Sequence, residues 1–95
     1  MKAIDIKDAQ LEFKKFLSEN KRSASTIVAY AKDIEQLSSF LQELKKNYIH
    51  DVIIEDLESF LSKMSKIGYT PKSISRKLNS IRPLYRFLKK SGYLT

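Results

Sequence analysis

Polar and basic residues between positions 72 and 86 carry the clearest chemistry that this sequence offers. On a helical wheel, one side of this segment presents two arginines, a lysine and an asparagine, flanked by two serines: Lys72, Ser73, Arg76, Asn79, Ser80 and Arg86. A guanidinium group binds a phosphate or a guanine edge through two hydrogen bonds, and a carboxamide pairs with adenine. Serine and lysine more often hold the nucleic-acid backbone. The pattern predicts a surface that contacts nucleic acid, against the alternative of an ordinary solvated helix face.

The distribution of charge favours the nucleic-acid interpretation. Residues 62–95 hold nine Lys or Arg side chains and no Asp or Glu. The other 61 residues are nearly neutral, with nine basic and eleven acidic side chains, so the formal net charge of +7 arises from one end of the chain. Solvated helix faces usually mix both signs, whereas a face of one sign is the expected footprint of a phosphate-binding surface.

A second candidate surface lies where another helix is expected to begin. Ser23, Ser25 and Thr26 cluster there, and the free backbone N–H groups of a helix start favour an anion. Lys21 and Arg22 precede the cluster and Lys32 follows it. The cluster predicts a phosphate contact, with plain N-capping by Ser23 as the alternative.

Composition argues against several other functions. The chain has no Cys and one His, which excludes disulfides, thiol catalysis and a Cys-based zinc site. No apolar run approaches the roughly 18 residues that span a bilayer, and the first ten residues do not resemble a signal peptide. No acid–base pair, phosphate loop or nucleophile–base set is present. We therefore expect an intracellular protein with no cofactor and no metal, which is not itself an enzyme.

Apolar residues recur every three or four positions along nearly the whole chain, which predicts four helices and no strand. The expected helices are Asp8 to Asn20, Ser23 to about Lys46, Ile54 to Ile67, and Thr70 to about Lys90. Tyr48 to Ile53 is expected to be an extended connector.

The last helix contains a proline, Pro83, which predicts a kink within the preceding turn. Its N-terminus is well defined, because Thr70 is a suitable cap and a proline follows it. The stripe that we expect this helix to bury is Ile74, Leu78, Ile81, Tyr85 and Leu88.

Three motifs carry a resemblance to a known family. They are Thr26-x-x-x-Tyr30-x-x-Asp33-Ile34-x-x-Leu37, Asp51-Val52-x-x-Glu55-Asp56-Leu57-x-x-Phe60-Leu61 and Arg76-x-Leu78-x-Ser80-Ile81-Arg82-x-Leu84-Tyr85-x-Phe87-Leu88. In this order, over residues 9–94, they resemble the N-terminal core-binding (SAM-like) domain of the tyrosine recombinases, the phage integrase and Xer group. Ile53, Asn79 and Pro83 depart from the family's pattern.

The resemblance implies an all-α fold, a four-helix orthogonal bundle in which residues 1–95 form one domain. The family's second and fourth helices cross the major groove of double-stranded DNA. The resemblance therefore implies DNA contact at the residues that match those helices by position: Ser25, Thr26, Lys72, Arg76, Asn79 and Ser80.

Recombinases of this family cut DNA with a separate downstream domain, which we expect to be absent here. The chain is then an inactive part of a site-specific recombinase or integrase that clamps the DNA site for strand exchange. Its expected partners are duplex DNA and, in the full-length protein, other recombinase protomers. We expect no membrane partner, a monomeric isolated domain, and a prokaryotic or phage-encoded cytoplasmic protein.

Two other functions remain open. A free-standing DNA-binding regulator of helix-turn-helix type would use the turn at residues 68–70 to present a recognition helix. Such a regulator would dimerise and bind a palindrome. A SAM-like protein-interaction module would instead bind an acidic partner, and DNA would not compete for its surface.

Overall fold

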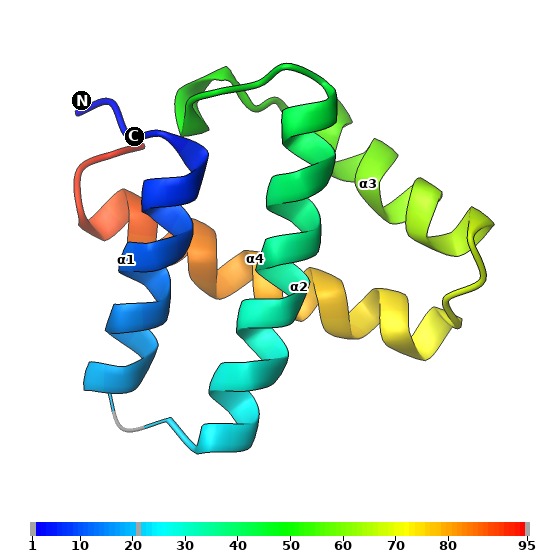
Figure 1. Ribbon diagram of the computed structural model, residues 1–95, viewed down its shortest axis with the longest axis horizontal. Coiled ribbons are helices and arrows are strands. Elements are labelled where there is room, and N and C mark those ends of the chain that lie inside the picture. The colour runs from blue at the N-terminus through cyan, green and yellow to red at the C-terminus, as the bar shows by residue number, and fades with distance from the viewer. Residues whose placement is uncertain (1, 21, 95) are drawn as a thin grey trace.

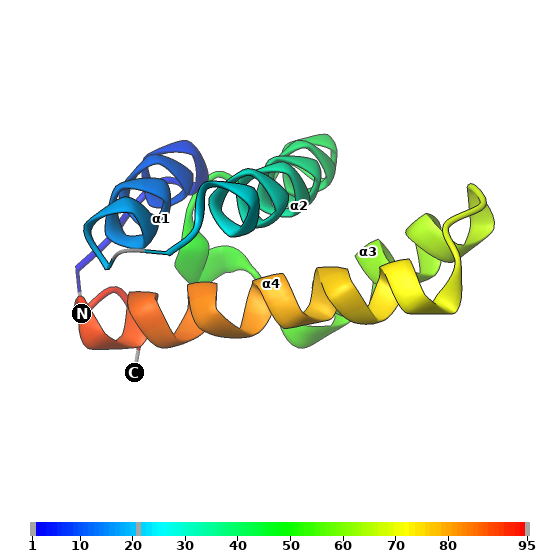
Figure 2. The ribbon, with the colours of Figure 1, turned by 90° about the horizontal axis from the view of Figure 1, so that it is seen from below.

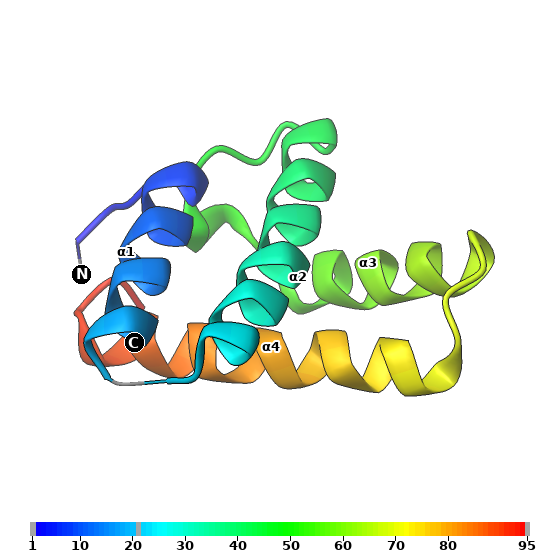
Figure 3. The ribbon, with the colours of Figure 1, turned by 60° about the horizontal axis from the view of Figure 1, so that its bottom comes forward.

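The computed structural model describes residues 2–20 and 22–94, so Lys21, which precedes the second candidate surface, lies outside the described residues. Within these residues the chain forms four α-helices: α1 (Ile6–Glu19), α2 (Ala24–Glu43), α3 (Ile54–Lys66) and α4 (Pro71–Lys90). Helices α1 and α2 form one antiparallel hairpin and α3 and α4 form another. The two hairpins cross steeply, as the views in Figure 1 and Figure 3 show. The prediction of an all-α, four-helix orthogonal bundle is confirmed.

Short polar side chains define most of the helix starts. The carboxylate of Asp5 accepts a hydrogen bond from the backbone N–H three residues ahead at 3.0 Å, and the hydroxyls of Ser23 and Thr70 do the same at 3.2 Å. Helix α1 therefore begins two residues before its expected start. Helix α3 has no capping side chain at Ile53, and the carboxylate of Asp56 accepts the Ile53 N–H at 2.9 Å instead.

Helix α2 ends at Glu43, earlier than the sequence predicts. Lys45 adopts a left-handed conformation with a φ of 61°, and the N–H of Lys46 donates to the carbonyl of Leu41 at 3.0 Å. This is the hydrogen bonding of a Schellman motif, which glycine usually terminates. Because a lysine takes the glycine position here, the sequence carries no signal for this helix end.

The connector between α2 and α3 is less extended than expected. Residues Ile49–Asp51 form a single 3₁₀ turn. Next to it, Tyr48 pairs with Asp5 in an isolated antiparallel bridge, and the N–H of Ile49 donates to the carbonyl of Ile4 at 3.0 Å. These bonds attach the segment before α1 to the connector.

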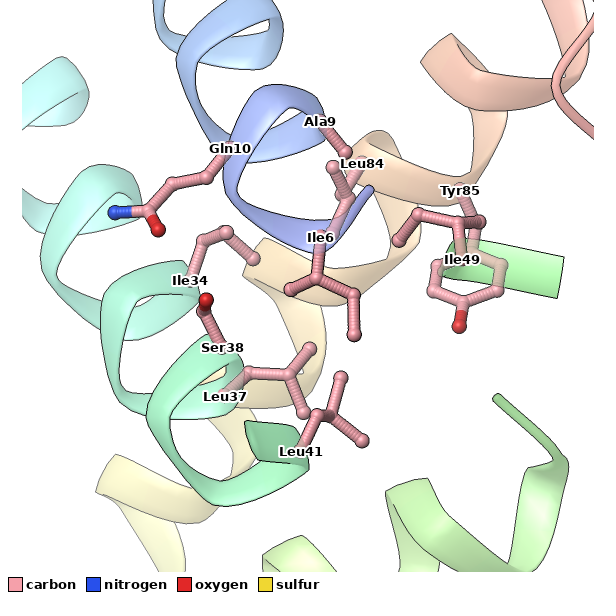
Figure 4. A pocket seen from close by; sticks show the side chains of 10 residues that line it. All are labelled: Ile6, Ala9, Gln10, Ile34, Leu37, Ser38, Leu41, Ile49, Leu84 and Tyr85. Atoms are coloured by element: carbon pink, nitrogen blue, oxygen red, sulfur yellow. The ribbon is translucent and has the colours of Figure 1, made fainter. Parts of the chain in front are cut away.

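The core forms where α1, α2 and α4 meet and extends to Phe60 and Met64 of α3, and the connector closes one end of it. Figure 4 shows Ile6 of α1 among Leu37 of α2, Ile49 of the connector and Leu84 of α4. The space between them is about 10 Å³, which holds at most one water molecule. This region is therefore a packed core rather than a ligand cavity.

Helix α4 passes through Pro83 without a sharp bend (Figure 2), so the predicted kink is wrong. Ile81 and Leu84 on either side of the proline are buried in one core, which holds the two halves of the helix in line. The predicted buried stripe was right at Ile81 and Leu88, but its other three residues are only half-buried, because the buried side is turned by roughly 60° from the predicted one. That side consists of Lys77, Ser80, Ile81, Leu84 and Leu88.

Candidate nucleic-acid interface

A buried carboxylate, Asp33, connects α2 to the polar side of α4. The side chain of Asp33 is 1% exposed. It accepts hydrogen bonds from Nη2 and Nε of Arg76, at 3.0 and 3.3 Å, and from Nζ of Lys77 at 3.1 Å. The hydroxyl of Ser80 donates a fourth bond at 2.8 Å. One carboxylate thus holds three polar residues of α4, at positions 76, 77 and 80, against α2.

Lys77 is as deeply buried as Asp33, at 1% exposed, and its ammonium has two more partners. Its Nζ donates to the side-chain oxygen of Gln36 and lies 4.2 Å from the centre of the Tyr69 ring. The amide of Gln36 in turn donates to the hydroxyl of Tyr69 at 2.8 Å. Within the part of the chain that the structure describes, no buried side-chain nitrogen or oxygen lacks a hydrogen-bond partner. The cluster is fully satisfied, as a buried polar network must be to avoid a large desolvation cost.

Burial raises the pKa of Asp33, but the hydrogen bonds from Arg76, Ser80 and Lys77 outweigh burial and hold that pKa below its ordinary value of 3.8. Asp33 is therefore ionised at neutral pH. Two cations surround this single anion, so the cluster adds positive charge where α2 and α4 meet.

The residues that the sequence proposed as nucleic-acid contacts fall into three groups. Thr26 and Ser73 are half-buried, and their hydroxyls bond the cap residues of their own helices, at 2.8 and 3.2 Å. Ser80 is 0% exposed and bonded to Asp33, so its expected place at the edge of the exposed side is wrong. The other seven are exposed: Ser23, Ser25, Lys32, Lys72, Arg76, Asn79 and Arg86.

The structure exposes three more cations on α4 that the sequence analysis did not propose as contacts, Arg82, Lys89 and Lys90. None of these three cations forms an ion pair with any residue in 2–20 or 22–94, and the same is true of Lys72 and Arg86. The signal for them was present in the sequence, because they belong to the stretch that lacks acidic residues. The helix rotation explains why Arg82 was missed, since it turns that side chain further into solvent.

One residue before α2 reaches the exposed side of α4. Arg22, which precedes α2, lines the same surface hollow as Pro83 and Arg86 of α4. On α2, Ser25 and Lys32 are seven residues apart and so share one side of the helix. We group the exposed candidate contacts of both helices under one name, the basic face: Ser23, Ser25, Lys32, Lys72, Arg76, Asn79, Arg82 and Arg86.

Other reactive side chains serve packing. Burial, and then the charge of Asp56, raises the pKa of Tyr85 to about 12, so its phenol stays protonated at neutral pH.

Within the described residues, no three His, Asp or Glu side chains are placed to hold a metal ion. No helix in the same residues is long and apolar enough to cross a membrane.

Comparison with known proteins identifies the family to which the chain belongs. The family model for the phage integrase N-terminal SAM-like domain matches residues 11–92. The chain belongs to this family and is a tyrosine recombinase N-terminal domain, as the three motifs predicted.

Among individual relatives, the chain is 32% identical over 76 residues to tyrosine recombinase XerC of Oceanobacillus iheyensis, covering 80% of this chain and 25% of that protein. It is 32% identical over 78 residues to tyrosine recombinase XerD of Rhizobium meliloti, covering 82% of this chain and 25% of that protein. It is 36% identical over 76 residues to tyrosine recombinase XerC of Chlorobaculum tepidum, covering 74% of this chain and 23% of that protein. The chain thus spans about a quarter of the length of these relatives. No solved structure gives a significant match.

Proposed function

We propose that this domain binds double-stranded DNA through the basic face and holds the site for strand exchange by a catalytic domain outside residues 1–95. One observation carries the proposal: the exposed cations Lys72, Arg82 and Arg86 lie along α4 with no anionic partner among the described residues. Unpaired cations on one helix side suit the regular phosphates of a duplex. Family membership supports the same function, because the relatives are named as recombinases.

Within this proposal the residues divide into those that touch DNA and those that position them. Arg86 and Lys72 neutralise phosphates, and Asn79 is placed to read a base edge. Arg76 remains 52% exposed while its guanidinium is bonded to Asp33, so it reaches DNA with its orientation already fixed. Ser80 is a positioning residue that does not touch DNA.

The start of α2 supplies a second contact in this proposal. Its first free N–H groups and the hydroxyl of Ser25 face a phosphate, with Lys32 on the same side of the helix. Ser23 and Thr26 contribute mainly by capping, because their hydroxyls are bonded to each other at 2.8 Å.

We further propose that residues 1–95 form one domain and that cleavage chemistry belongs to the remainder of a longer recombinase. The chain's share of its relatives' length supports this division. Contacts between protomers then involve the full-length protein on DNA, and the isolated domain is monomeric and cytoplasmic. Membership in the family favours a recombinase domain over a free-standing regulator or an interaction module.

Fluorescence anisotropy with a labelled duplex at low salt tests the proposal. Arg86→Glu should weaken binding at least about tenfold, and log Kd should rise with log salt by about 0.9 for each phosphate neutralised. Lys14→Glu is a matched control, because Lys14 is an exposed cation beside the groove between α1 and α2, which no residue of α4 lines. Equal losses in the two variants, or no response to salt, would show that the basic face is not a DNA site.

A further inference from the structure

A hollow of about 380 Å³ lies between the end of α1 and the second half of α4. Its floor is apolar: the rings of Phe16 and Phe87 lie 4.8 Å apart between centroids, and Pro83 adjoins them. All three side chains are half-buried and so remain partly open to solvent. The volume is within the range of roughly 300–1,000 Å³ that is typical of binding pockets.

Only cations accompany this apolar floor. The other residues that line the hollow are Arg22, Arg86, Lys89 and Lys90. No acidic residue lines it, and none of the four cations forms an ion pair within the described ranges. The matching occupant must carry an apolar group for the floor and negative charge for the surrounding cations.

Duplex DNA satisfies only half of that requirement. Its phosphates would suit the cations, but its bases are stacked inside the helix and no apolar group projects from the backbone to fill a recess. A protein segment carries both features, because one side chain enters the recess while neighbouring carboxylates remain at its edge. Aromatic residues and arginine are also enriched at protein–protein interfaces, where buried anchor side chains fill such pockets.

We propose that this hollow docks an acidic protein segment, with one aromatic side chain between Phe16, Phe87 and Pro83 and flanking Asp or Glu residues paired with the cations. This interaction goes beyond DNA binding, because it uses Lys89 and Lys90, which lie outside the basic face. Arg86 belongs to both surfaces and so cannot separate the two interactions.

The test is an amide NMR titration with the blocked peptide Asp-Glu-Asp-Phe-Asp-Glu-Asp. Shifts should concentrate at Phe16, Phe87 and the end of α4. Replacing the central Phe of the peptide by Ala should weaken binding about tenfold, because a buried aromatic anchor is lost. The double variant Lys89→Gln/Lys90→Gln should weaken peptide binding by a similar factor and change the affinity for duplex DNA less than about twofold.

Arg22→Gln, which lies outside the helices, provides a second variant with little risk to folding. It should also weaken peptide binding, whereas the distant control Lys14→Gln should not. Absence of peptide shifts, or equal binding of the peptide that lacks Phe, would overturn the proposal. A loss of duplex affinity in Lys89→Gln/Lys90→Gln as large as its loss of peptide affinity would also overturn it, because the hollow would then belong to the DNA site.

Discussion

The carboxylate of Asp33 on α2 accepts two hydrogen bonds from the guanidinium of Arg76 on α4, at 3.0 and 3.3 Å, between residues 43 positions apart in the sequence. Asp33 is almost fully buried, whereas Arg76 keeps about half of its side chain in solvent, 52%. The pair therefore links the core to the basic face. A change at either residue should affect both the stability of the domain and its surface chemistry.

Replacing Asp33 by Asn should lower the free energy of unfolding by about 3–5 kcal/mol, because it leaves Lys77 buried without its anion. Denaturant unfolding followed by circular dichroism measures the loss. Glu35→Gln, an exposed acidic residue on the same helix, is the control and should change stability by less than about 0.5 kcal/mol. Similar unfolding midpoints for the two variants would contradict the structural role of the buried cluster.

Acid should destabilise the domain through the same carboxyl. Because the pKa of Asp33 is lower in the folded domain than in the unfolded chain, the unfolded chain takes up the proton at a higher pH. Stability is therefore full above the ordinary value of 3.8 and falls as the pH drops toward the folded-state pKa. Melting curves between about pH 6 and pH 3 should show a steeper loss for the parent protein than for Asp33→Asn. Parallel losses would mean that other carboxyls dominate acid unfolding.

The rotation of α4 is tested by two leucines on different sides of the helix. Leu84 is 3% exposed, whereas Leu78 is only half-buried. Leu84→Ala should cost about 2–5 kcal/mol as a core truncation, and Leu78→Ala should cost clearly less. The sequence-based stripe included Leu78 and omitted Leu84. If Leu78→Ala is the more damaging change, the stripe was right and the orientation of α4 described here is wrong.

Alanine substitutions at two neighbouring residues of α4 should affect different properties, stability in one case and DNA affinity in the other. Ser80→Ala removes a buried hydrogen bond to Asp33 and should cost about 1 kcal/mol of stability, with little effect on DNA affinity. Asn79→Ala leaves stability unchanged, because Asn79 is exposed, and should weaken DNA binding by about 1–3 kcal/mol. Thermal melts and anisotropy on both variants give the comparison. A large loss of DNA affinity in a folded Ser80→Ala domain would contradict the assignment of Ser80 as buried.

Local signals account for the part of the fold that the sequence predicted. Ser23 and Thr70 cap α2 and α4 as expected, and Gly68, with a φ of 111°, terminates α3. The early end of α2 was not predictable in this way, because Lys45 adopts a left-handed conformation that a lysine does not signal. Periodicity located the helices well, but it did not determine which side of α4 faces the core.

The error on α4 has a specific cause. The helical wheel placed Ser80 beside the exposed side, and the predicted buried stripe left Lys77 out, yet both are buried because Asp33 satisfies them. A pair so distant in sequence leaves no trace in local periodicity. The available signal was that Asp33 and Arg76, of opposite charge, both occupy fixed positions of the family motifs. Pairing them would have turned α4 to its observed orientation and made Arg76 a residue of both core and surface.

The most direct test of DNA binding is an amide NMR titration of the domain with a generic duplex at low salt. We predict that shifts are confined to residues 23–32 at the start of α2 and residues 72–86 of α4. Shifts centred on α1 and α3, or no shifts at all, would contradict the proposal that the basic face binds DNA.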